Sequence, residues 1–147
     1  MEQRDWNKPD RDEWVAALVD AVAAAQRPVV ILAHGLGATT TVLAAEHMAG
    51  RVAGAMLAAP PAAGLLAHYS DLRSGFAGIP MAPLPFPSLV FASRNDPDCP
   101  HDDAGAMALS WGSALVDAGE AGKLDAASGH GPWPEGLMRF GGFLGRL

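Results

Sequence analysis

The first apolar positions of the chain recur at helical spacing behind a helix-capping pattern. Asp10 followed three residues later by Glu13 has the form of a capping box, in which each side chain accepts from the other residue's backbone N–H. The apolar positions beyond it are Trp14, Leu18, Ala21, Val22 and Ala25. This pattern predicts a helix from Arg11 to about Gln26, which Pro28 ends.

Three uncharged apolar runs predict strands. They cover Val29–Ala33, Val52–Ala58 and Ser88–Ser93, and a weaker fourth strand is expected at Leu115–Asp117. The run Val29–Ala33 is apolar at every position, which is typical of a central parallel strand that is covered on both faces.

Three further helices are expected around these strands. One follows the turn His34–Gly37 and is apolar almost all round, which predicts deep burial before Gly50 ends it. Another follows Pro100 and carries apolar residues at Ala104, Met107, Ala108 and Trp111. The last helix has an apolar face made of Leu137, Phe140, Leu144 and Leu147. The segment Pro61–Pro87 is rich in proline and has no periodicity, which indicates an irregular connection or a cover over a site.

The alternation of strands and helices predicts an α/β fold with a doubly wound, mainly parallel sheet, in a single domain over residues 1–147. A formal net charge of −6 without any cluster of Lys or Arg argues against a nucleic-acid partner. The apolar stretches are too short or too interrupted for a membrane span. The one cysteine, Cys99, supports neither an internal disulfide nor a thiolate metal cluster. We therefore expect a cytoplasmic protein without cofactor or metal.

Three loops carry candidate chemistry, because ligands bind beyond the carboxyl ends of parallel strands. In Ala33–Gly37, small residues stand two positions before and after Gly35 on a strand-to-helix turn, which is the frame of a nucleophile elbow, G-x-S-x-G, with glycine in place of serine. A second loop places Asp96 behind a strand, where a carboxylate can orient an imidazole. The third places His130 between glycines ahead of the last helix.

The order nucleophile position, Asp96, His130 is the chain order of α/β-hydrolases. The sequence resembles the small serine-hydrolase family that includes retinoblastoma-binding protein nine and the bacterial YdeN-type hydrolases. The matched segments are Asp5-Trp6, Pro9-Asp10-Arg11, Trp14, Pro28–Gly37, Ala59-Pro60-Pro61, Pro85–Ser88, Ser93–Pro97 and Ser128–Glu135. The resemblance implies an α/β-hydrolase fold and an acyl, ester or peptide hydrolase with a Ser-His-Asp triad. Its aspartate would be Asp96, its histidine His130, and its serine would stand where this chain has Gly35.

Two departures from that family predict impaired or absent catalysis. Gly35 has no hydroxyl, and loss of the nucleophile costs a serine hydrolase on the order of a million-fold in turnover. The family's first strand and Gly-rich loop, which supply one oxyanion donor, have no counterpart here. The backbone N–H of Leu36 is then the predicted remaining donor, and His34 and Trp133 are expected to line the pocket.

The absent first strand also predicts an open sheet edge beside Val29–Ala33. A homodimer, complementation by a strand from a separate segment, or a truncated sequence would each explain such an edge. The other expected partner is a small acyl or ester ligand or a peptide, with neither nucleic acid nor membrane involved.

Plainer interpretations stand beside these. Glycine tolerates positive φ without strain, which favours Gly35 once catalysis is not needed, and His130 could be an ordinary loop histidine. His34–Gly37 could instead be an oxyanion loop of the H-G-x-G kind, although no downstream serine sits in an elbow frame. The cluster Asp96, Asp98, His101, Asp102 and Asp103 lacks the spacing of a calcium loop and does not favour a metal. Three functions remain open: an impaired serine hydrolase, a non-catalytic module that binds a ligand or protein, and water activation by Asp96 and His130.

Overall fold

Four parallel strands form one sheet in the order β1-β2-β3-β4. The computed structural model describes residues 3, 5–68 and 75–147 of the chain. Its strands are β1 (Val29–His34), β2 (Val52–Ala58), β3 (Ser88–Ala92) and β4 (Ala114–Asp117). The register places Ala33, Leu57, Val90 and Leu115 side by side across the sheet. The predicted α/β class and all four strands are confirmed.

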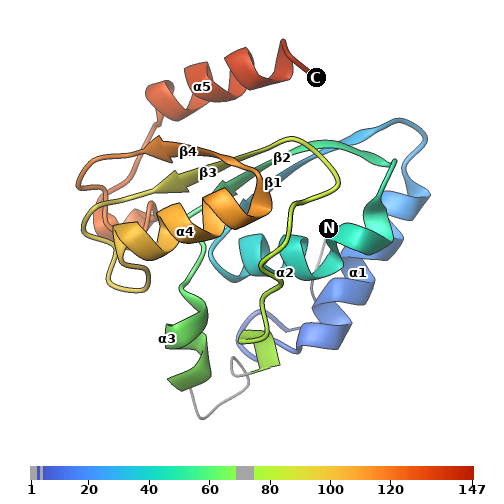
Figure 1. Cartoon of the computed structure of the whole chain (residues 1–147), viewed down its shortest axis with the longest axis horizontal. Helices are drawn as coiled ribbons and strands as arrows, with labels where there is room; N and C mark the ends of the chain where they lie inside the picture. Colours follow the sequence, from blue (N-terminus) through green and yellow to red (C-terminus); the bar gives the residue numbers. More distant parts are fainter. Residues whose placement is uncertain (1–2, 4, 69–74) are drawn as a thin grey trace.

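Helices cover both faces of the sheet (Figure 1). The lower face in that view carries α1 (Arg11–Ala24), α2 (Leu36–Ala44) and α4 (His101–Trp111), whereas α5 (Pro134–Leu144) covers the upper face. A short 3-10 turn, η1 (Ala45–Met48), continues α2, and another, η3 (Ala126–Ser128), lies between β4 and α5. The predicted irregular segment 61–87 contains one helix, α3 (Ala63–His68), and its residues 69–74 lie outside the described part of the chain.

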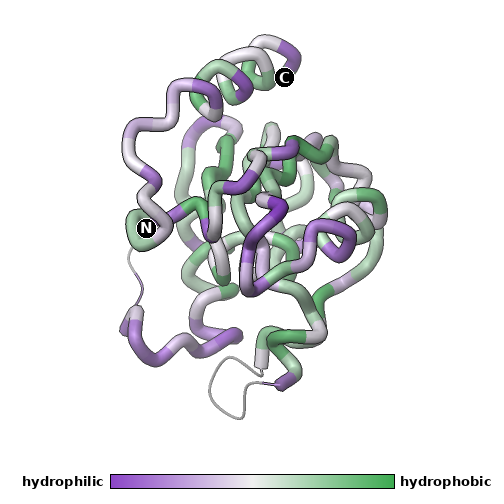
Figure 2. Tube along the Cα trace, turned by 90° about the vertical axis from the view of Figure 1, so that its left-hand side faces the viewer, coloured by the Kyte–Doolittle hydropathy of each residue, from purple (hydrophilic) through white to green (hydrophobic). Residues whose placement is uncertain are grey.

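Local sequence signals account for the helix starts and the core. The Asp10 carboxylate accepts from the backbone N–H of Glu13 at 2.9 Å, which confirms the predicted cap of α1. Trp14, Leu18 and Val22 then face the core, where they join α2 and the inner side chains of the strands. Figure 2 shows the hydrophobic strands inside the molecule and the hydrophilic segments in the outer loops. Helix α2, which follows the turn at Gly35, is buried as predicted, and its buried residues include the consecutive Thr39, Thr40 and Thr41.

Two expectations about burial are wrong. The run of β1 predicts a strand covered on both faces, but the side chain of Leu32 is 62% exposed. The place of β1 at the end of the sheet agrees with the open edge expected beside Val29–Ala33. On α5, Phe143 faces the sheet while Leu137 is 70% exposed. The close approach of α5 depends on Gly54 of β2, because a Cβ there would stand 2.7 Å from the Phe143 ring.

The tryptophans also differ in burial. Trp14 and Trp111 are buried, and the Trp111 indole N–H donates to the carbonyl oxygen of Pro80 at 2.8 Å. Trp6 is 62% exposed and packs edge-on against Trp14, with 5.5 Å between ring centroids. A bulky aromatic residue near the chain end does not by itself predict burial, since its neighbours decide how much of it is covered.

Candidate functional site

The turn between β1 and α2 has a backbone conformation that side chains rarely adopt. Gly35 has φ +56° and ψ −127°, its N–H donates to the carbonyl oxygen of Ala58 at 2.9 Å, and its own carbonyl accepts from Ala38. A Cβ built on Gly37 would lie 3.9 Å from the Cβ of Ala33, so the small residues flanking the turn do meet closely. A Cβ built on Gly35 itself meets nothing within 4 Å. The position therefore has space for a side chain, but its φ penalises every residue except glycine.

Leu36 is the first residue of α2, which leaves its backbone N–H without an intrahelical partner. At the end of the neighbouring strand, Ala59 also has a positive φ of 46° and donates its N–H to the carbonyl oxygen of Phe91. Positive φ at a non-glycine residue costs of order 1–3 kcal/mol and is concentrated at functional sites. The sequence singled out Ala59 only as part of the matched segment Ala59-Pro60-Pro61, and nothing in it indicated the positive φ.

His34 is held by a segment far along the chain. Its Nε2 lies 2.6 Å from the backbone carbonyl oxygen of Lys123, so Nε2 carries the proton of this hydrogen bond. The Lys123 ammonium forms an ion pair with Asp98, and this contact raises the pKa of Lys123. Sequence reasoning did not identify Lys123, a lone basic residue in a polar loop.

A buried serine organises the loops that surround Asp96. The hydroxyl of Ser93 donates to Oδ1 of Asn95 at 2.7 Å and accepts from the backbone N–H of Ala121 at 2.9 Å. Asp96 accepts from the backbone N–H of Asp98 at 2.8 Å. Burial raises the pKa of the Asp96 carboxyl, while the Asp98 N–H and the charge of Lys123 act in the opposite direction.

His130 lies in the loop that leads to α5. Its backbone N–H donates to the carbonyl oxygen of Asp125 at 3.1 Å, and its ring packs edge-on against Trp133 with 5.5 Å between centroids. Nε2 of His130 is buried without a hydrogen-bond partner. Among the described residues no hydrogen bond joins the ring to Asp96, and the charge interactions of Asp96 involve His34 instead. The proposed triad pairing of these two residues thus stays a prediction.

A groove of about 810 Å³ runs from the elbow along β1. Its apolar wall contains Trp14, Leu18 and Val22 of α1, while its polar end contains Asp98, Lys123 and Asp125. Gly35 and His34 border the groove, whereas Trp133 and His130 are not among its lining residues. Hydrogen bonds from the hydroxyl and N–H of Ser128 lower the pKa of Asp125, which favours the ionised form of this carboxyl.

The described residues contain neither a group of side chains suited to a metal ion nor a helix suited to a membrane span. No three His, Cys, Asp or Glu side chains there are grouped to hold a metal ion. No helix in the same ranges is long and apolar enough to cross a membrane.

The chain is similar to known hydrolases in sequence and in fold. Residues 1–141 match the family described as serine hydrolase. A YdeN-like hydrolase from Pectobacterium atrosepticum is 37% identical with a TM-score of 0.81, and the match covers 95% of this chain and 71% of that one. Among curated proteins, none matches.

More distant structures share the fold alone. The ydeN gene product of B. subtilis has a TM-score of 0.78 at 16% identity, over 99% of this chain and 81% of that one. The mouse alpha/beta hydrolase domain-containing protein 10 has a TM-score of 0.66 at 14% identity, over 86% and 67%.

Proposed function

This chain belongs to the serine hydrolase family, and we propose that it keeps the scaffold of such an enzyme while Gly35 occupies the place of the nucleophile. Its parallel sheet is that of an α/β hydrolase. The observation that carries the proposal is the φ of +56° and ψ of −127° at Gly35. An elbow holds its catalytic serine on a sharp, strained turn between strand and helix, and glycine adopts such a turn at no steric cost.

Without a hydroxyl at this position, no acyl-enzyme can form by the usual route. Loss of the nucleophile reduces turnover on the order of a million-fold, and what remains comes from binding and the oxyanion hole. The N–H of Leu36 is the donor that we assign to that hole. We assign to His130 the role of the base and to Asp96 the role of orienting it. The buried, unpaired Nε2 of His130 supports this role, since a base needs a free nitrogen.

A fluorophosphonate probe, which labels activated serines, tests the proposal. The natural chain should not be labelled, and Gly35→Ser should be, because the site has space for the added side chain. Gly35→Ala is the matched control, since it adds the same Cβ and the same backbone strain without a hydroxyl. Labelling of the natural chain, or a folded Gly35→Ser protein that stays unlabelled, would contradict the proposal.

The roles of Asp96 and His130 are tested in the Gly35→Ser background. Adding His130→Ala should abolish labelling, because nothing would then accept the serine proton. Adding Asp96→Asn should slow labelling without abolishing it, since an orienting carboxylate acts through the imidazole. Labelling that is indifferent to His130→Ala would remove His130 from the site while leaving the role of Gly35 intact.

The groove supports a second candidate function, the binding of an acyl or ester ligand without turnover. Its volume of about 810 Å³ lies within the range of small-molecule sites, and its apolar wall ends at the elbow. A ligand that binds only the folded chain, at a free concentration of 100 times its Kd, raises the free energy of unfolding by about 2.7 kcal/mol. Thermal denaturation with a series of p-nitrophenyl esters of increasing chain length would detect this.

The matched variants for that experiment are Leu65→Glu and Leu109→Glu. Leu65 lines the groove, whereas Leu109 is 83% exposed on α4. Only Leu65→Glu should remove the stabilisation by ligand. Equal loss in both variants, or no stabilisation of the natural chain by any ester of the series, would argue against binding in the groove.

A further inference from the structure

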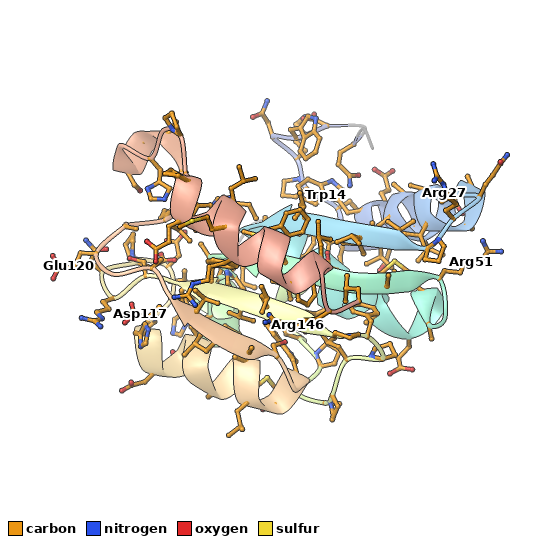
Figure 3. The ribbon with its side chains drawn as sticks, turned by 90° about the horizontal axis from the view of Figure 1, so that it is seen from above. Trp14, Arg27, Arg51, Asp117, Glu120 and Arg146 are labelled. Atoms are coloured by element: carbon orange, nitrogen blue, oxygen red, sulfur yellow. The ribbon has the colours of Figure 1, made fainter. Side chains whose placement is uncertain are left out.

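Three consecutive residues of the turn between β1 and α2 contribute different features to one end of the groove. His34, Gly35 and Leu36 all line it, where β1 passes into α2. Figure 3 shows the sheet from above, with Arg51 labelled at the amino ends of the strands and Asp117 at their carboxyl ends. The turn lies at the carboxyl ends, which is where ligands bind in sheets of this kind.

Space lies open beside the α-carbon of Gly35. A Cβ built there meets no atom of the described residues within 4 Å, apart from its chain neighbours. Methanol has the same two heavy atoms as the serine side chain, one carbon and one oxygen. A free methanol keeps its carbon about 3.5–4 Å from the α-carbon, since no bond joins them. A molecule of this size therefore fits beside Gly35 and brings a hydroxyl to the elbow.

The imidazole of His34 has its second nitrogen available as a base. Nε2 donates its proton to the carbonyl oxygen of Lys123, so the neutral ring carries its free lone pair on Nδ1. In the part of the chain that the structure describes, no hydrogen bond uses Nδ1. The bond to Lys123 fixes this tautomer, as the carboxylate does for the histidine of a catalytic triad.

Two carboxylates lie close enough to His34 to stabilise its protonated ring. The charge of His34 interacts with those of Asp96 and Asp125. A base that takes up a proton during a reaction becomes an imidazolium, and nearby negative charge lowers the free energy of that state. His130 is not among the lining residues of the groove, so a molecule beside Gly35 meets the imidazole of His34.

We propose that this turn catalyses acyl transfer from an ester to a methanol-sized alcohol bound beside Gly35, with Nδ1 of His34 as the base. The alcohol oxygen bonds to the acyl carbon while its O–H bond breaks, and Nδ1 takes the proton. The N–H of Leu36 donates to the oxyanion that forms on the acyl oxygen. The bond from the acyl carbon to the original alcohol then breaks, and that alcohol leaves with the proton from Nδ1. This inference rests on the proposed place of Gly35 at the nucleophile position.

A free alcohol reacts far more slowly than a hydroxyl that the backbone holds in place. Effective molarities of well-oriented groups are about 10⁵–10⁸ M, so methanol at about 1 M should recover at most about 10⁻⁵ of the turnover of Gly35→Ser. In a serine hydrolase without its nucleophile, the remaining catalysis still exceeds the uncatalysed reaction by about 10³–10⁴-fold. The activity is therefore measured over hours, against protein-free solution, with product detection by mass spectrometry.

The test follows the formation of methyl butyrate from p-nitrophenyl butyrate in the presence of methanol. The natural chain should form it at least about tenfold faster than protein-free solution does. The preference for methanol over 2-propanol should exceed the preference in protein-free solution, because the space beside Gly35 limits the size of the alcohol. Gly35→Ala should lose most of the transfer, since its Cβ occupies that space. No methyl ester above the protein-free rate, or equal transfer by Gly35→Ala, would overturn the proposal.

His34→Gln tests the base. The glutamine amide can donate to the Lys123 carbonyl oxygen as Nε2 does, but it has no basic nitrogen. A general base contributes about 10²–10⁴-fold, so transfer to methanol should fall to near the protein-free rate. His47→Gln, which changes an exposed histidine of η1, is the matched control and should keep full transfer. Transfer that survives in His34→Gln would overturn the proposal, and its loss in His130→Ala would then assign the base to that residue.

Labelling of Gly35→Ser by the fluorophosphonate probe separates this inference from the proposed function. If Gly35→Ser is labelled while the natural chain forms no methyl ester, the elbow is correct and transfer to a free alcohol is wrong. If a folded Gly35→Ser stays unlabelled, the nucleophile position is wrong and both fail.

Discussion

His34 and Lys123 stand 89 positions apart in the chain and are joined by a hydrogen bond of 2.6 Å from the imidazole Nε2 to the backbone carbonyl oxygen. The bond ties the last residue of β1 to the loop that follows β4, across the carboxyl ends of the whole sheet. Gly35, the proposed nucleophile position, directly follows His34. The loop and the elbow are therefore positioned by the same contact.

Removal of that contact should loosen the loop between β4 and α5. His34→Ala is expected to lower the free energy of unfolding by about 0.5–1.5 kcal/mol and to speed hydrogen exchange at the Lys123 amide, which donates to Ser128. His34→Gln, whose amide can donate in place of Nε2, is the control and should retain most of the protection. Equal exchange rates in the natural chain and in His34→Ala would show that the bond does not hold the loop.

Ser93 should be the most sensitive polar residue of the region. Its side chain is fully buried, so Ser93→Ala leaves the N–H of Ala121 without its partner and should cost about 1–3 kcal/mol in urea denaturation. Ser110→Ala is a matched control, because Ser110 lies in α4 with no hydrogen bond of its side chain in the described structure. It should be neutral or slightly stabilising, since alanine favours helix. Equal effects of the two changes would contradict the role of Ser93.

The raised pKa of Asp96 predicts how the stability of the fold depends on pH. Burial raises the pKa of its carboxyl above the ordinary 3.8, so the folded chain binds this proton more tightly than the unfolded chain does. The stabilisation from Asp96 is then complete below the ordinary pKa and is lost as pH rises through the raised value. Asp96→Asn can still accept from the Asp98 N–H and does not titrate.

The stability of Asp96→Asn relative to the natural chain should therefore increase as pH rises from the ordinary pKa of 3.8 through the raised pKa of Asp96. Urea denaturation at a series of pH values measures this difference. Asp20→Asn, which neutralises an exposed carboxyl on α1, is the control for general charge removal. A relative stability of Asp96→Asn that falls over the same interval would contradict the sign of the shift.

Cys99 should be inert in the folded protein. Its side chain is buried, and burial together with Asp96, Asp103 and Asp98 raises the pKa of its thiol to about 12. At pH 8 the thiolate fraction alone slows reaction with Ellman's reagent by about three orders of magnitude relative to a free cysteine. The absorbance of the released thiol in the presence and absence of urea tests this. Rapid reaction without urea would show that the region around Cys99 opens readily.

The sequence by itself determined the four strands, the helices α1, α2, α4 and α5, and the turn at Gly35, but not helix α3. Val29–Ala33, Val52–Ala58 and Ser88–Ser93 are apolar runs between breakers, and Asp10 caps the first helix, so local signals suffice to predict them. The small residues around Gly35 likewise identify the elbow, because that motif has small residues two positions before and after its centre.

Only the tertiary structure decided which residues meet at the carboxyl ends of the strands. The hydrogen bond from His34 to Lys123 and the bonds at Ser93 join residues that are far apart in sequence. Such bonds between distant loops produce no repeating pattern in the sequence, so they could not be predicted from it. The tertiary structure also decided the exposure of the Leu32 side chain. Whether an apolar strand is central or lies at an edge depends on its neighbours in the sheet and not on its own residues.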